Sequence, residues 1–93
     1  MKYTHTITID QNNVLFSKDE DFMRMVLHWV CEHVRYKLKV QGRIELNTIR
    51  YIFAVDLDPT INPVFDINDM TDFDIHFEKI DDVWIVTVET EYK

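Results

Sequence analysis

The chain has 93 residues and a mass of 11.3 kDa, which allows one domain with one hydrophobic core and excludes separate cofactor and substrate domains. Leu, Ile, Val and Phe account for 31 residues, a third of the chain, so we expect a folded protein rather than a disordered one. The formal net charge of −7 argues against direct binding to nucleic-acid phosphates or to anionic lipid.

The first predicted elements are a strand and a helix. From Tyr3 to Ile9 every second residue is a threonine, and the alternation is typical of a half-buried strand, with a turn over residues 10–13. Ser17 followed by Glu20 fits a capping box, which predicts that a helix begins there. The apolar residues of this helix recur at spacings of three and four: they are Met23, Val26, Leu27, Val30 and Val34.

The end of this helix has two interpretations. In the first, the helix runs to about Val40 and is ended by Gly42, the only glycine of the chain. In the second, it ends near Tyr36, and Gln41 and Gly42 form the turn of a hairpin. We favour the first interpretation.

The middle of the chain is predicted to be extended. Ile44 and Leu46 indicate a short extended piece, and the segment 49–57 reads as a strand because its apolar residues alternate. One face of this strand would carry Ile49, Tyr51, Phe53, Val55 and Leu57. Residues 58–71 contain both prolines and are predicted to be a long loop.

Two further strands are predicted, over residues 72–80 and 83–92, with Asp81 and Asp82 as the turn between them. The fold class is therefore α+β. We expect one long helix packed on an antiparallel sheet of four or five strands, with a β-hairpin at the C-terminus.

This hairpin brings acidic residues together. A two-residue turn at Asp81 and Asp82 sets Asp74 opposite Glu89 and Asp72 opposite Glu91 on one face, with the apolar residues on the other. Like charges that face each other destabilise a sheet, and the paired positions of the two strands contain no lysine or arginine on this face. We therefore expect carboxylates without cationic partners in their own chain.

The charge distribution leads to a functional hypothesis. Residues 1–50 carry a net charge of +2 and residues 51–93 a net charge of −9. We expect a non-enzymatic inhibitor that occupies the basic site of a nucleic-acid-binding or defence protein and imitates the charge of nucleic acid. In size and charge the chain resembles compact inhibitors encoded by bacteriophages or mobile elements. The candidate partner-binding residues are Asp56, Asp58, Asp66, Asp69, Asp72, Asp74, Glu78, Glu89 and Glu91.

Three alternatives accompany this hypothesis. The acidic residues could form only a solvated face that keeps the protein soluble. The protein could be an immunity protein or antitoxin that neutralises a basic toxin enzyme. It could also bind a divalent metal through Asp74, His76 and Glu89, although we predict no metal site and no cofactor.

The residues Tyr51–Ile61, YIFAVDLDPTI, resemble the first motif of the haloacid dehalogenase superfamily, an apolar strand followed by Asp-x-Asp-x-Thr. The resemblance implies a nucleophile at Asp56 and a general acid/base at Asp58 beside Mg²⁺. The rest of the chain departs from that family, and a single glycine excludes a P-loop or a glycine-rich phosphate cradle. We therefore expect no enzyme activity.

Two features of the helix complete the set of candidates. His28, Cys31, Glu32 and His33 fall within one stretch, but too few share a face to close a metal site. Phe22, Met25 and Trp29 widen the apolar sector of the helix, so we expect it to touch a second surface.

Apolar residues on both sides of the middle segment also favour a homodimer. No apolar run of 18 residues and no signal peptide is recognisable, so we expect a cytoplasmic protein that binds no membrane.

Overall fold

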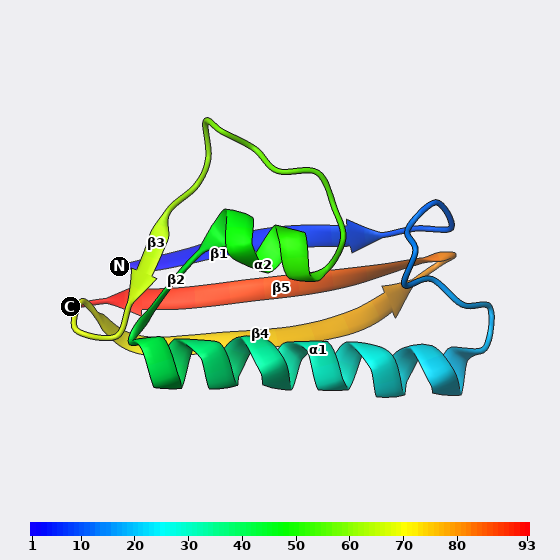
Figure 1. The fold of residues 1–93 in the computed structure, drawn as a ribbon, viewed down its shortest axis with the longest axis horizontal. Coiled ribbons are helices and arrows are strands. Elements are labelled where there is room, and N and C mark those ends of the chain that lie inside the picture. Colours follow the sequence, from blue (N-terminus) through cyan, green and yellow to red (C-terminus); the bar gives the residue numbers. More distant parts are fainter.

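The computed structural model describes residues 1–93, in which five strands and two helices form two layers (Figure 1). In chain order the elements are β1 (Lys2–Ile9), α1 (Glu20–Gln41), β2 (Arg43–Glu45), α2 (Leu46–Ile52), β3 (Val64–Asp66), β4 (Met70–Ile80) and β5 (Val83–Tyr92). Neither helix combines the length and the apolar character that crossing a membrane requires.

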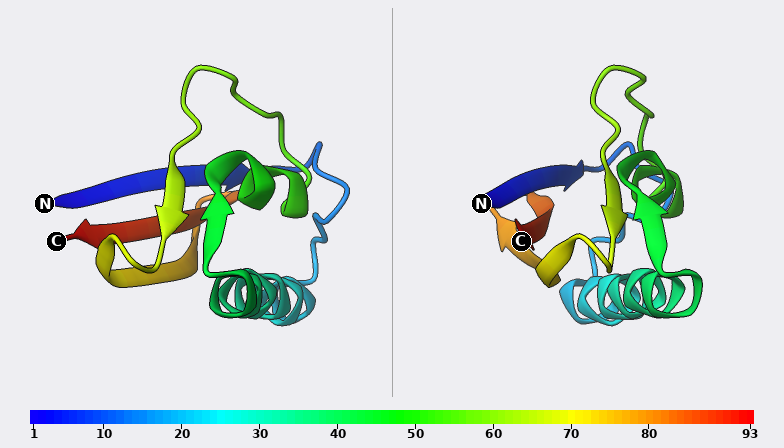
Figure 2. Two further views of the ribbon diagram at one scale, coloured as in Figure 1. Left: turned by 60° about the vertical axis from the view of Figure 1, so that its left-hand side comes forward. Right: turned by 90° about the vertical axis from the view of Figure 1, so that its left-hand side faces the viewer.

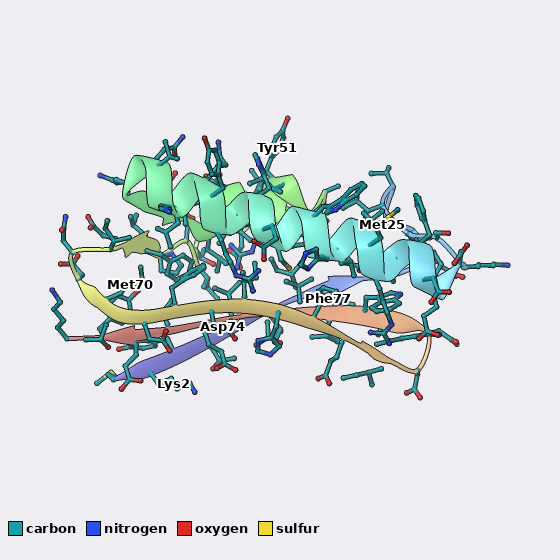
Figure 3. The ribbon with its side chains drawn as sticks, turned by 90° about the horizontal axis from the view of Figure 1, so that it is seen from below. Lys2, Met25, Tyr51, Met70, Asp74 and Phe77 are labelled. Atoms are coloured by element: carbon teal, nitrogen blue, oxygen red, sulfur yellow. The ribbon has the colours of Figure 1, made fainter.

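One layer is an antiparallel sheet of three strands in the order β1-β5-β4. The other layer contains both helices and a separate two-stranded sheet of β2 and β3. The expectation of one sheet with four or five strands is therefore corrected, whereas the α+β class and the long helix are confirmed. Both helices lie on the same side of the three-stranded sheet, and its other side is open (Figure 3).

Helix α1 is held at both ends by its own sequence. Asp19 is the N-cap, with a carboxylate oxygen that accepts a hydrogen bond from the Phe22 backbone N–H at 3.1 Å. The predicted capping box at Ser17 is wrong: the Ser17 hydroxyl instead accepts from the Asp19 N–H, and the helix begins at Glu20. Gly42 ends the helix at φ 79°, and its N–H donates to the Leu38 carbonyl, which confirms the favoured helix end.

Helix α2 replaces the strand predicted over residues 49–57. Leu46, Ile49 and Phe53, at spacings of three and four, are fully buried on the same side of the sheet as α1. Alternation and helical spacing overlap in so short a segment, so the local pattern fits either structure. The helix forms because it places these three side chains over the part of the sheet that α1 leaves uncovered, while the exposed Tyr51 points to solvent.

The C-terminal hairpin is the part of the fold that most closely follows the sequence. Ile80 pairs with Val83 around the turn at Asp81, which takes a positive φ of 54°. The predicted register is confirmed, and β4 begins two residues earlier than expected, at Met70, with an irregularity before Asp72. On the helix side of the sheet, the core is formed by Ile7, Ile9, Ile75, Trp84, Val86 and Val88.

Candidate functional site

The open side of the three-stranded sheet carries the acidic residues in regular rows. The first row across the strands is Lys2, Glu91 and Asp72, and the second row is Thr4, Glu89 and Asp74. Asp74 and Lys2 are both on the side of the sheet turned away from α1 (Figure 3). We call the five carboxylates of this side the acidic sheet face: Asp72, Asp74, Glu78, Glu89 and Glu91.

Two of these carboxylates are paired within the chain, which corrects part of the expectation. The Lys2 ammonium lies 3.2 Å from Glu89 Oε2. Asp74 Oδ2 lies 2.7 Å from His76 Nδ1, and Asp74 Oδ1 lies 3.9 Å from Arg35 Nη2. The Arg35 side chain extends from α1 over the edge of β4 and also donates a hydrogen bond to the Ile75 carbonyl. Asp74 and Glu89 are therefore neutralised in part by basic groups from the first half of the chain.

The other three carboxylates of the acidic sheet face have no such partner. Asp72, Glu78 and Glu91 take part in no ion pair, and the side chains of all three are exposed. Asp72 and Glu91 are directly opposite each other, at a position where cross-strand Cβ atoms are about 5 Å apart. Asp72 and Glu91 lie at the end of the sheet where β4 begins and β5 ends, beside Lys2 of β1, whereas Glu78 lies near the hairpin turn.

The remaining four candidate residues lie outside this face. Asp58 belongs to the loop after α2, where its carboxylate accepts from the Thr60 hydroxyl at 2.6 Å and the Thr60 N–H at 2.8 Å. These hydrogen bonds hold the pKa of Asp58 below its usual range. Asp66 accepts from the Asn68 N–H in the turn that leads to β4, and Asp69 ends that turn. Asp56 is an exposed residue of the same loop as Asp58. The structure therefore brings together five of the nine predicted residues.

The segment that resembles the dehalogenase motif is built differently from an apolar strand. Tyr51 and Ile52 are the last residues of α2, and Ala54 follows at a positive φ of 58°. The Asp58 carboxylate is used to hold its own turn. The local structure that the resemblance implied is thus absent.

No group of three His, Cys, Asp or Glu side chains is placed to hold a metal ion. In α1, the Cys31 side chain is buried, whereas the side chains of His28, Glu32 and His33 are exposed. The thiol therefore lies on the core side of the helix, apart from the other three groups. On the acidic sheet face, His76 has one side-chain hydrogen-bond partner, Asp74.

The Cys31 thiol allows a prediction about pH. Burial raises the pKa of this thiol from 9.0 to about 11; Arg35 opposes this rise, and Glu32 and Asp74 add to it. Because the pKa is higher in the folded state, the contribution of this thiol to stability is complete below pH 9 and is lost as the pH rises toward 11. At pH 8 we expect a thiol reagent to label the native protein at least about 100-fold more slowly than the denatured protein. Equal labelling rates in stopped-flow absorbance would contradict this burial.

Two features of the surface have no counterpart in the sequence-based prediction. The first is that Lys2 and Arg35 form ion pairs with carboxylates of the acidic sheet face. These pairs depend on the register of β1 against β5 and on the position of α1 over β4. A cleft of about 450 Å³ lies at the hairpin end, where Lys18, Lys79 and Asp82 line it together with buried Trp84. The cleft is lined by both acidic and basic side chains, so its charge favours neither an anionic nor a cationic ligand.

No protein-family model, curated protein or solved structure matches this chain.

Proposed function

We propose that this protein is a non-enzymatic binding protein whose acidic sheet face receives a basic protein. The observation that carries the proposal is the pair of Asp72 and Glu91, which face each other without an ion-pair partner. Such a pair weakens the isolated sheet, and an arginine or lysine from a partner would relieve the repulsion and be bound by two carboxylates at once.

The arrangement of the face supports a partner that normally binds nucleic acid. The carboxylates follow two neighbouring strands, and residues two apart on one strand are separated by about 6.7 Å. This spacing is about twice the axial advance of about 3.4 Å per nucleotide along each strand of a duplex, so carboxylates on one strand match every second phosphate along the axis. We therefore propose that the protein acts as an inhibitor that competes with nucleic acid for the partner's basic site.

Lys2 and Arg35 also fit this proposal. Each contacts one carboxylate of the face, so five carboxylates face two cations and the surface keeps a negative excess. Thr4, Thr6 and Thr8 of β1 add uncharged polar side chains to the same side of the sheet, next to Lys2. A basic protein would thus meet an acidic strip beside a polar one.

The test is the double substitution Asp72→Asn with Glu91→Gln. It removes the facing charges and leaves the Lys2–Glu89 and Arg35–Asp74 contacts intact. We expect the free energy of unfolding to rise by about 0.5 kcal/mol in urea titrations. In calorimetry against a panel of purified basic DNA- and RNA-binding proteins, we expect binding to weaken at least about 10-fold at low salt, since two charge-assisted contacts are lost.

The matched control is Glu45→Gln with Asp56→Asn, which changes the net charge equally at exposed sites away from the acidic sheet face. It should leave binding within about twofold of the unmodified protein. The DNA or RNA ligand of a bound panel member should also displace the protein. Absence of binding to every panel member, equal weakening by both double variants, or failure of nucleic acid to compete would each count against the proposal.

A further inference from the structure

The outer side of α1 carries an apolar stripe that no part of the chain covers. Phe22, Met25, Trp29, Tyr36 and Val40 form this stripe, which we call the α1 stripe. The three largest exposed fractions are 63% for Trp29, 64% for Tyr36 and 62% for Val40. At 100° per residue these positions gather on one side of the helix, opposite the buried face of Met23, Leu27, Cys31, Val34 and Leu38.

The position of α1 leaves this stripe free along its whole length. The helix forms one border of the molecule, and no other segment lies beyond it in either view of Figure 2. From Phe22 to Val40 the stripe extends about 27 Å, at about 1.5 Å per residue. Glu32 and His33 interrupt this strip between Trp29 and Tyr36, but its length and two large aromatic side chains exposed by more than half are typical of an interaction surface.

We propose that the α1 stripe binds the α1 stripe of a second copy of this chain, with the two helices antiparallel. The two ends of the stripe match each other when the helix is reversed around its middle, whereas Trp29 has no apolar counterpart. A twofold axis near residue 31 sets Phe22 against Val40 of the second copy and Met25 against Tyr36 of the second copy. Trp29, near the axis, then lies against Glu32 and His33 of the second copy, and the apolar contacts form at the two ends of the stripe.

The charges beside the stripe select the antiparallel arrangement. Asp21 and Lys39 lie along the same border of the stripe, at opposite ends of the helix, and neither takes part in an ion pair within its own chain. In an antiparallel pair, like borders face each other, so Asp21 of each copy meets Lys39 of the other, twice per dimer. A parallel pair would instead bring the two acidic helix ends together.

This inference does not depend on the proposed function. The α1 stripe faces away from the sheet, so the acidic sheet face stays open in the dimer (Figure 3). A pair of single helices of this length contacts a small area, below the size of most permanent interfaces, and we expect a dissociation constant in the micromolar range.

The first experiment is sedimentation equilibrium of the whole chain from about 1 to about 300 μM, concentrations that bracket a micromolar dissociation constant. We expect a monomer–dimer equilibrium in this range. Trp29→Glu should weaken dimerisation at least about 30-fold, because it places a charge in the centre of the contact. The control is Tyr51→Glu on α2, a residue that is 76% exposed and lies outside the stripe, and it should leave the equilibrium unchanged.

The second experiment tests the direction of the helices by exchanging charges. Lys39→Glu or Asp21→Lys alone should each weaken the dimer about fivefold at low salt, and the double variant should restore it, because each dimer contains two such pairs. Circular dichroism checks that each variant remains folded. A monomer at every concentration, a dimer that Trp29→Glu leaves intact, or a double variant weaker than both single variants would overturn the proposal.

Discussion

Replacing Trp84 with alanine is expected to lower the free energy of unfolding by about 4 kcal/mol, a large part of the roughly 5–10 kcal/mol typical of a domain of this size. Trp84 is 2% exposed and lies on β5, the central strand of the sheet. Its ring packs 6.1 Å from the Phe77 ring, and the Arg24 guanidinium of α1 lies 5.1 Å from its centroid. The substitution therefore removes one contact within the sheet and one contact between α1 and the sheet, and urea unfolding followed by circular dichroism measures the loss.

The matched control for Trp84 is its neighbour Ile85. Ile85 points to the open side of the sheet and is only half-buried, so Ile85→Ala should cost less than about 1.5 kcal/mol. A loss equal to that of Trp84→Ala would mean that the open side of the sheet is covered as thoroughly as the helix side. The arrangement of the two layers would then be wrong.

Replacing Ile49 with alanine is expected to lower the free energy of unfolding by about 3 kcal/mol, whereas Tyr51→Ala should change it by less than about 0.5 kcal/mol. Ile49 is fully buried beneath α2, and Tyr51, two residues later, is 76% exposed. Tyr51 points away from the sheet (Figure 3). The helix accounts for this difference, since two successive residues rotate the side-chain direction by about 200° around the helix axis and so place it on nearly the opposite side.

The same pair of variants separates the helix from the strand that the alternation predicts. In a strand, Ile49 and Tyr51 would share one face, and both substitutions would be costly or both would be mild. Similar losses for the two variants in urea unfolding would therefore contradict α2. The helical content in far-ultraviolet circular dichroism provides a second readout.

The two proposed surfaces are on different sides of the molecule, which makes them separable by experiment. The acidic sheet face belongs to β4 and β5, and the α1 stripe belongs to the helix on the other side of that sheet (Figure 3). A dimer formed through α1 would present two acidic sheet faces to basic partners. Variants of Trp29 should then change the number of partners bound per assembly and leave the affinity of each face unaltered.

Local sequence determined the C-terminal hairpin and the end of the long helix. A two-residue turn fixes the register of both strands, so the opposition of Asp74 to Glu89 and of Asp72 to Glu91 followed from counting residues outward from Asp81 and Asp82. The helix end followed from Gly42, because a single residue that readily takes a positive φ is enough to end a helix. These features depend on neighbours in sequence alone.

Tertiary structure alone decided the second helix and the partners of the acidic residues. The segment from Leu46 to Ile52 is compatible with either helix or strand, and the uncovered part of the sheet selected the helix, because there it buries one side of the segment. Lys2 and Arg35 are far from Glu89 and Asp74 in sequence, and the pairing of β1 with β5 and the passage of α1 along β4 bring them close. Contacts of this kind depend on how separate elements pack, and a single sequence does not display that packing.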